Sequence, residues 1–490
     1  MTINILEYLD SIVRIYPDKL AFSDGTQGLS FCELRDAAQA IGTRLAHIGT
    51  RKPIVVSMPK KPQTVAAFFG VIYSGNMYVP IDDEMPAGRM EAIFENLRPA
   101  AVICDDEMTV PYNGEIYRYS EIIHTTVDDV VLKEIRSNAI DTDPVYVVFT
   151  SGSTGIPKGV AACHRSVIDY IEQLSLTLGF DENTVFGSQT PLYVDACLKE
   201  LIPTIRFAAT TYLIPKERFM FPIRLVEYLN AHRINTVCWV VSALATVSGL
   251  GALDKIKPEY LHTIAFGSEV FAVKQLNKWR QALPNARFYN LYGPTECTGM
   301  SCWYEVERDF AEDEPIPIGK PFRNTRVMLL DGEVPSDCGE LCITGTPLTL
   351  GYYNDPERTN AAFIQNPRNT AYHELIYRTG DICRYNERDE LVFVSRRDHQ
   401  IKHMGHRIEL GEIEAAAAGI DGAVSVCCLF DDKRKKIILY YTGVVEIAAM
   451  SEYLKTRLPR YMRPNAIQNL NEMPLLPNGK IDRKGLGGFF

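Results

Sequence analysis

The chain has 490 residues, 46% of them hydrophobic, and its 51 Lys and Arg against 61 Asp and Glu give a net charge of −10. This length supports two or more domains. The lack of a basic cluster argues against a nucleic-acid partner, because tracking phosphates requires grouped Lys and Arg. Twelve cysteines lack metal-ligand or disulfide spacing. With no signal-like start and no bilayer-spanning apolar run, we expect a reduced, soluble, cytoplasmic protein without a membrane partner.

The first 300 residues alternate between helical and strand patterns. Apolar residues at helical spacing predict helices over 5–16, 34–48 and 64–74, and short apolar runs predict strands over 54–56, 78–81 and 100–104. The alternation resumes with strands near 185–190, 210–214, 236–240 and 262–266. This order predicts α/β layers.

The composition changes twice towards the C-terminus. Short strands and turn residues dominate after about residue 300, which predicts a β-rich subdomain over about 305–397. Beyond it we expect a helix over 409–418, strands over 423–430 and 436–444, and a helix over 447–458. We therefore predict a large domain over 1–397, built of α/β subdomains and the β-rich subdomain, and a small α+β domain over 398–490.

The most informative stretch is a polar loop between two apolar runs. It reads Thr150-Ser151-Gly152-Ser153-Thr154-Gly155-Ile156-Pro157-Lys158-Gly159. Glycines leave backbone N–H groups open to an anion, hydroxyls donate further hydrogen bonds, and Lys158 adds a positive charge. The pattern lacks the Gly-Lys-Ser/Thr ending of the P-loop, and the flanking apolar runs predict strand–loop–strand. The alternative is a flexible surface loop.

Three later segments carry groups suited to a nucleotide. In Asn290-Leu291-Tyr292-Gly293-Pro294-Thr295-Glu296, the aromatic ring offers a flat face to a purine, and the carboxylate can bind Mg²⁺ beside a triphosphate. A capped tight turn is the alternative there. In Tyr377-Arg378-Thr379-Gly380-Asp381, the aspartate can accept two hydrogen bonds at once. Near the C-terminus, Lys480 follows a Pro-Asn-Gly turn.

Together with the segment from Ser395 to Glu414 and the Gly-Lys-Ile-Asp-Arg ending, these motifs resemble, in order, the signatures of the adenylate-forming enzymes. This superfamily contains acyl-CoA synthetases, luciferases and adenylation domains. The resemblance is closest to free-standing amino-acid adenylation domains of nonribosomal peptide synthetases and to D-alanine–carrier-protein ligases. It implies ATP and Mg²⁺ as cofactors.

The resemblance also implies roles for individual residues. Lys480, Thr295 and Lys158 would be catalytic, Glu296 would bind the metal, and Asp398 would be the hinge of a mobile small domain. The nucleotide would be bound by Thr150, Ser151, Gly152, Ser153, Thr154, Gly155, Lys158, Asn290, Tyr292, Gly293, Thr295, Asp381 and Arg396. The sequence departs from the family at Ser395, where glycine is usual, and at Met404, where arginine is usual.

A substrate site is implied by the same resemblance. Asp195 would pair with the α-ammonium of an amino acid; the alternative is a helix N-cap. The side-chain pocket would be formed by Ala196, Lys199, Trp239, Ile264, Phe266, Gly267, Leu291, Gly299 and Met300. Lys199 suggests an acidic substrate side chain, whereas the bulk of Trp239 and Phe266 leaves a small substrate equally open.

The implied reaction has two steps. The substrate carboxylate attacks the α-phosphate of ATP and pyrophosphate leaves; the small domain then turns about Asp398 and admits a phosphopantetheine thiol. Because the sequence ends just past Lys480, we expect the thiol on a separate carrier protein or on coenzyme A. The alternatives are an acyl- or aryl-CoA ligase, a D-alanine–carrier-protein ligase, and a non-catalytic relative.

Overall fold

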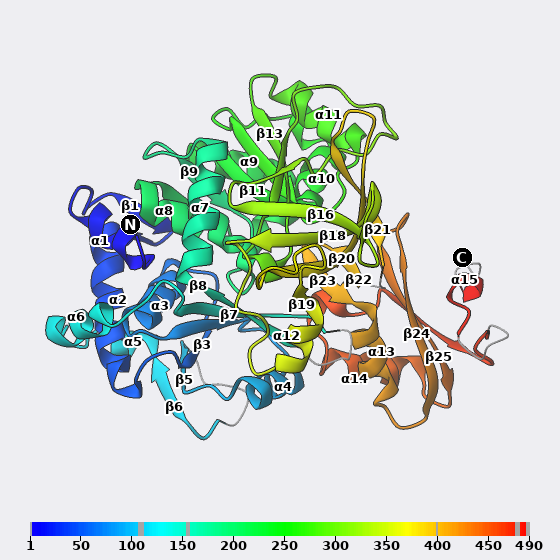
Figure 1. Cartoon of the computed structure of the whole chain (residues 1–490), viewed down its shortest axis with the longest axis horizontal. Helices are drawn as coiled ribbons and strands as arrows, with labels where there is room; N and C mark the ends of the chain where they lie inside the picture. The colour runs from blue at the N-terminus through cyan, green and yellow to red at the C-terminus, as the bar shows by residue number, and fades with distance from the viewer. Residues whose placement is uncertain (1, 106–111, 153–156, 398–399, 476–480, 487–490) are drawn as a thin grey trace.

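The structure is a computed structural model that describes residues 2–105, 112–152, 157–397, 400–475 and 481–486. Figure 1 shows a large body, built from the N-terminal segments, with a smaller C-terminal part against one side of it. The body contains two large sheets with helices packed against them and a β-rich sheet. The predicted α/β fold class, with a large domain and a small α+β domain, is confirmed.

A six-stranded sheet carries the polar loop at one edge. Its order is β6 (Glu115–Arg118), β5 (Ala101–Cys104), β3 (Pro53–Ser57), β4 (Met77–Ile81), β7 (Pro144–Thr150) and β8 (Lys158–Cys163). The strands are parallel except for the antiparallel pair β7 and β8. The polar loop connects this pair, so the predicted strand–loop–strand arrangement is confirmed.

A nine-stranded sheet forms the second layer. Its order is β15 (Lys320–Pro321), β14 (Cys302–Glu305), β13 (Arg287–Tyr292), β12 (Thr263–Gly267), β11 (Thr236–Val240), β9 (Val185–Ser188), β10 (Thr210–Leu213), β1 (Leu20–Ser23) and β2 (Gly28–Ser30). The predicted strands at 185–190, 210–214, 236–240 and 262–266 are confirmed within two residues. Strands β1 and β2 were not predicted, because both strands are short and a tight turn joins them.

The largest hydrophobic core lies between these sheets. It combines side chains of both sheets with helices α1 (Leu6–Val13), α2 (Phe31–Leu45), α3 (Pro62–Tyr73), α7 (His164–Leu178) and α8 (Leu198–Phe207). Helix α3 is buried at nearly every position, which explains why its sequence is apolar all round. A second core covers the opposite face of the nine-stranded sheet, under α9 (Pro222–Ala231), α10 (Val241–Gly249) and α11 (Val273–Ala282).

The β-rich sheet brings the Tyr377–Asp381 motif towards the other motifs. It comprises β16 (Thr325–Asp331), β17 (Val334–Pro335), β18 (Cys338–Gly345), β19 (Phe363–Gln365), β20 (Leu375–Tyr385) and β21 (Leu391–Arg396). Its core includes Tyr292 and Cys297 from the nine-stranded part and Val160 from β8. The three sheets therefore meet around the predicted nucleotide motifs.

The small domain begins with the hairpin of β22 (Gln400–His403) and β23 (His406–Glu409). Helices α13 (Leu410–Ala418) and α14 (Ile447–Lys455) then pack on a sheet of β24 (Ala423–Asp431), β25 (Lys436–Gly443) and β26 (Ala466–Leu470). The short helix α15 (Arg483–Leu486) lies at the outer end of this domain, far from β7 and β8 (Figure 1). None of the helices in the described segments has the length and apolar character needed to cross a bilayer.

Candidate active site

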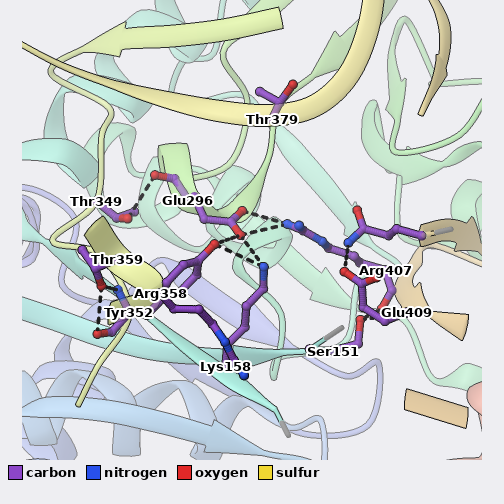
Figure 2. A network of polar contacts seen from close by, with 12 residues as sticks. Ser151, Lys158, Glu296, Thr349, Tyr352, Arg358, Thr359, Thr379, Arg407 and Glu409 are labelled. Carbon is purple, nitrogen blue, oxygen red and sulfur yellow. Dashed lines mark hydrogen bonds and ion pairs between the residues drawn. The ribbon is translucent and has the colours of Figure 1, made fainter. Parts of the chain in front are cut away.

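Glu296 lies at the centre of the candidate site. Its Oε1 accepts hydrogen bonds from Lys158 Nζ at 3.0 Å and from the Tyr352 hydroxyl at 2.8 Å. Arg407 of the small domain donates from Nη1 to Oε1 at 3.0 Å and to Oε2 at 2.8 Å. Figure 2 shows the three donors converging on this one carboxylate. The side chain of Glu296 is fully buried.

The backbone around Glu296 is fixed from two sides. Glu296 lies in the 3₁₀ turn η5 (Thr295–Cys297), and its carbonyl oxygen accepts from the amide and the hydroxyl of Thr349. Gly293 precedes it where a Cβ would lie 2.0 Å from the carbonyl oxygen of Gly299. Only glycine fits there, which explains the Gly-Pro turn in this motif.

The charges at this cluster depend on one another. Burial alone would raise the pKa of Glu296, but the charges of Arg407 and Lys158 outweigh it and hold the pKa well below its usual value. Burial and the nearby Arg407 lower the pKa of Lys158, despite the attraction of Glu296. The carboxylate is therefore ionised, as a metal ligand must be.

The polar loop approaches the cluster from β7. Ser151 is buried, and its hydroxyl donates to the carbonyl oxygen of Arg407 at 2.8 Å and accepts from the amide of Glu409 at 3.2 Å. The amide of Gly152 donates to Glu412 Oε2 at 3.2 Å. The Thr150 hydroxyl is buried and has no hydrogen-bond partner among the residues that the structure describes. Ser153, Thr154 and Gly155 lie outside the described residues.

A second cluster joins the Tyr292 and Asp381 motifs. The Tyr292 hydroxyl donates to Asp381 Oδ2 at 2.5 Å, and Arg396 Nη1 contacts Asp381 Oδ1 at the same distance. Asp381 and Arg396 face each other across β20 and β21. Asn290 has a structural contact, since its amide donates to the carbonyl oxygen of Pro317. The structure therefore brings Tyr292, Asp381 and Arg396 together, as the resemblance implied.

Asp195 lies beside Thr295, which links the substrate motif to the nucleotide motif. Burial raises the pKa of Asp195, while a hydrogen bond with the Thr295 side chain and the charge of Lys199 act in the opposite direction. Asp195 is not an N-cap residue: it is the first residue of the 3₁₀ turn η2 (Asp195–Cys197), whose N-cap is Val194, and the N-cap of the following helix α8 is Cys197. Burial disfavours the charged form of Asp195, and a capping role does not account for its position. Its carboxylate is therefore suited to a cationic ligand.

The structure describes four further predicted pocket residues, of which Lys199 interacts with Asp195 through its charge. Leu291 and Met300 belong to the same core as Cys197 and Leu198, which directly follow Asp195 and Ala196. Gly299 has φ +97°, and a Cβ there would lie 3.0 Å from the ring of Tyr170. Lys199 in α8 is only 3% exposed.

Trp239, Ile264 and Phe266, three predicted pocket residues, do not share a core with Leu291 and Met300. All three belong to the second core, on the opposite face of the nine-stranded sheet, and the Trp239 indole donates to the carbonyl oxygen of Gly187. Their neighbours Cys238 and Ala265 belong to the core of Leu291 and Met300 instead. Successive residues of a strand point to opposite faces, so a shift of one residue exchanges the two sets. Gly267 has no side chain and lies against the Leu291 carbonyl.

The predicted catalytic residue Lys480 and the predicted hinge residue Asp398 lie outside the described residues. Arg483, three residues beyond Lys480, pairs with Glu414 at 2.7 Å within the small domain. Helix α15, which begins at Arg483, lies at the outer end of that domain (Figure 1). Among the described residues, the small domain presents groups to the site from β22, β23 and α13; Lys402 of β22 lies over the Tyr292 ring, with its Nζ 5.3 Å from the ring centroid.

Sequence reasoning missed two residues of the central cluster. Neither Tyr352 nor Arg407 was assigned a role, although Arg407 is part of the segment from Ser395 to Glu414. Their signal was weak, because Arg407 contacts a residue 111 positions away. The available clue was a cation close to two glutamates, Glu409 and Glu412, at the start of a helix.

The donors present fit a magnesium ion bound with phosphate. Glu296 would supply an ionised oxygen ligand, and Lys158 and the Gly152 amide would supply donors for the phosphates of the same ligand. Among the described residues, no group of three His, Cys, Asp or Glu could hold a metal alone. The ion would therefore need ligand oxygens in addition to Glu296.

The fold and the grouping of these motifs define an adenylate-forming protein. Residues 9–353 match the family described as AMP-binding enzyme, and the chain belongs to this family. It is 29% identical over 502 residues to tyrocidine synthase 1 of Brevibacillus parabrevis, an alignment that covers 99% of this chain and 45% of that protein. The chain thus spans less than half the length of this relative.

Two solved structures show the same fold. One is an NRPS protein containing adenylation and PCP domains, with a TM-score of 0.86 and 24% identity, over 99% of this chain and 84% of the other. The second is o-succinylbenzoate CoA synthetase from Bacillus subtilis, with a TM-score of 0.83 and 18% identity, over 98% of both chains. At these identities the likeness concerns the fold alone.

Proposed function

We propose that this protein uses ATP to activate an amino acid as its aminoacyl-AMP, releases pyrophosphate, and transfers the aminoacyl group to the phosphopantetheine thiol of a separate carrier protein. The observation that carries the proposal is the position of Asp195 beside Thr295. In this proposal Asp195 would bind the α-ammonium, and Lys158 and Glu296, which are hydrogen-bonded to each other, would bind the polyphosphate and its metal ion. Tyr292, Asp381 and Arg396 would hold the nucleoside.

The order of groups along the site supports this reaction. Asp195 fixes the ammonium end of the substrate, so its carboxylate extends towards Thr295 and the α-phosphate. Lys158 and Glu296 lie beyond, where the departing pyrophosphate would be held with Mg²⁺. Bound there, the ion would neutralise phosphate charge. The relatives described as nonribosomal peptide synthases favour an amino acid over a fatty or aryl acid.

Lys199 favours an anionic substrate side chain. Within the described chain it donates no hydrogen bond and has no carboxylate within 4.0 Å, although it is nearly fully buried. The buried carboxyl groups of Asp195 and Glu200 interact with its charge, and a hydrogen bond to a substrate carboxylate would stabilise the buried ammonium further. The bulky residues that suggested a small substrate, Trp239 and Phe266, point to the other core. The pocket face instead carries Cys238 and Ala265.

Pyrophosphate exchange with a panel of all amino acids, including D-forms, tests the proposed reaction. We expect exchange with one or a few amino acids, with Asp or Glu among them. Exchange only with fatty or aryl acids would instead identify an acyl- or aryl-CoA ligase. Preference for D-alanine over L-alanine and over acidic residues would identify a D-alanine–carrier-protein ligase.

The role of Lys199 is tested by Lys199→Met. We expect exchange with the preferred acidic amino acid to fall about a hundredfold, because a charge-assisted hydrogen bond is lost. Exchange with the uncharged amide of that amino acid should rise relative to the acid. Lys133→Met, on an exposed helix position, serves as the matched control. An equal loss for acid and amide would contradict the assigned contact.

A further inference from the structure

Glu200 is a buried glutamate that the proposed reaction does not use. It follows Lys199 in α8 and is fully buried. Among the described residues, neither of its carboxylate oxygens has a hydrogen-bond partner. Burial raises the pKa of Glu200, while the charges of Lys199 and Lys60 act in the opposite direction. Because a buried carboxylate without hydrogen bonds is costly, the ionised form of Glu200 depends on these two cations.

Lys60 reaches this region from the connection between β3 and α3. Its Nζ donates to the carbonyl oxygen of Ser188 at 2.9 Å and to that of Ile214 at 3.4 Å. These two oxygens lie at the neighbouring ends of the parallel strands β9 and β10. Ser188 is fully buried, and its side chain lies near the Glu200 carboxylate. The ammonium of Lys60 is therefore held at the strand end that also faces Glu200.

Three further titratable groups interact with Glu200. They are the thiols of Cys197 in η2 and Cys238 in β11 and the phenol of Tyr170 in α7. Burial raises the pKa of all three groups, so they are neutral near pH 7. Burial lowers the pKa of Lys60, and the charge of Glu200 opposes that change. The charge of Glu200 is thus balanced by Lys60 and Lys199.

The sharing of Glu200 between two lysines matters for the predicted substrate pocket. If Lys199 alone balanced Glu200, its ammonium would be drawn into an internal pair. The negative charge of Glu200 would also repel a carboxylate on the substrate. Such effects act over several ångströms in a buried site, because the low dielectric constant screens them weakly. A second cation beside Glu200 removes both obstacles.

We propose that Lys60 is a positioning residue for substrate selection: it balances the charge of Glu200, so that Lys199 remains available to an anionic substrate side chain. The proposal rests on the proposed amino-acid-activating function and on the contact assigned to Lys199. Lys60 touches neither substrate nor nucleotide in this scheme. A determinant of specificity therefore lies outside the pocket, in the connection before α3.

The test compares pyrophosphate exchange with the preferred acidic amino acid and with its uncharged amide in the full chain. In Lys60→Met the ratio of acid to amide exchange should fall about tenfold, because Glu200 then competes for Lys199. Lys60→Arg should keep the wild-type ratio, since the positive charge is retained. The control Lys61→Met removes the neighbouring exposed lysine and should leave the ratio unchanged.

A double variant separates the charge effect from a structural one. In Glu200→Gln the ratio should equal or exceed that of the wild type, because the competing charge is absent. Lys60→Met/Glu200→Gln should recover the ratio to within about twofold of Glu200→Gln. A ratio that stays low in the double variant would overturn the proposal, since Lys60 would then act through the strand ends that it contacts.

Two other results would also overturn the proposal. One is an unchanged ratio in Lys60→Met that is folded by circular dichroism; if this variant does not fold, a ratio below wild type in Glu200→Gln decides against the competition. The other is wild-type exchange with neutral amino acids alone, which leaves the activating function in place. Absence of exchange with every amino acid would overturn the proposed function as well.

Discussion

Arg407 and Glu296, 111 residues apart in the sequence, form a paired contact in which one guanidinium nitrogen reaches both carboxylate oxygens at 3.0 and 2.8 Å. The pair joins the small domain to the predicted metal ligand of the large domain. It also explains why Glu296 tolerates complete burial, since Lys158 and Tyr352 complete its hydrogen bonds. The consequences of this arrangement for binding, catalysis and domain motion can be tested separately.

Glu296→Gln should impair both catalysis and stability. The amide is a poor magnesium ligand and leaves the buried Lys158 unpaired, so pyrophosphate exchange should fall at least about a hundredfold. We expect the free energy of unfolding to fall by about 3 kcal/mol, measured by urea denaturation. Glu357→Gln, on the exposed surface of α12 (Pro356–Ala362), is the control. Normal exchange in Glu296→Gln would exclude the metal role.

Asp381→Asn should weaken nucleotide binding without affecting pyrophosphate binding. The amide would present a donor to Tyr292 or Arg396, so one charge-assisted hydrogen bond is lost and the ATP affinity should fall about tenfold to a hundredfold. Asp389→Asn is the matched control, because it lies in the exposed turn after the same strand at φ 59°, which Asn tolerates. Equal losses for ATP and pyrophosphate would mean that Asp381 only supports the fold.

Asp195→Ala distinguishes an amino-acid substrate from a simple carboxylic acid. The variant loses the partner of the α-ammonium, so exchange with the preferred amino acid should fall about a hundredfold. Exchange with the corresponding acid that lacks the amino group should change little. Asp83→Ala, at an exposed position, is the control. If both substrates lose activity equally, the ammonium contact is not the role of Asp195.

Docking of the small domain should weaken at acidic pH through His406. Burial lowers the pKa of His406 to about 4 in the docked state, against 6.5 for a free side chain. Docking therefore favours the neutral ring. The contribution of His406 to the stability of the docked state is complete above pH 6.5 and is lost as the pH falls towards 4. Between pH 7.5 and 5.5 the ratio of undocked to docked molecules should increase about tenfold, as measured by hydrogen exchange of the hairpin.

His406→Phe is the control for this pH dependence, because it keeps the ring contact with Tyr461 and removes the titrating group. It is needed since Asp82 also titrates nearby, with its pKa raised to about 6 by burial. The same tenfold change in His406→Phe would assign the pH response to Asp82 or to His403 instead.

Lys480→Ala should separate the two half-reactions. Adenylate formation should be nearly abolished, because the cation opposite the reacting oxygens is lost, while ATP binding stays within about twofold. Transfer from supplied aminoacyl-AMP to a carrier thiol should continue at the wild-type rate. Lys455→Ala, an exposed position of the small domain, is the control. Undiminished pyrophosphate exchange would contradict the assigned role.

The sequence by itself determined the α/β layers, the β-rich subdomain and the strand–loop–strand position of the polar loop. These follow from local patterns: apolar periodicity, turn residues, and a run of glycines, hydroxyls and one lysine between two strands. It also indicated Lys158, Glu296, Tyr292 and Asp381 as candidate site residues, because each belongs to a short motif whose residue types carry chemistry.

Only the tertiary structure decided which groups meet. The register of β11 and β12 turned Cys238 and Ala265 towards the core that contains Leu291 and Met300, and Trp239 and Phe266 towards the opposite core, since one residue along a strand reverses the face. The docking of the small domain brought Arg407 and Glu412 to the predicted metal and phosphate positions. Such contacts join segments far apart in the chain, so no local pattern specifies them; they arise from packing and from the pairing of buried charges.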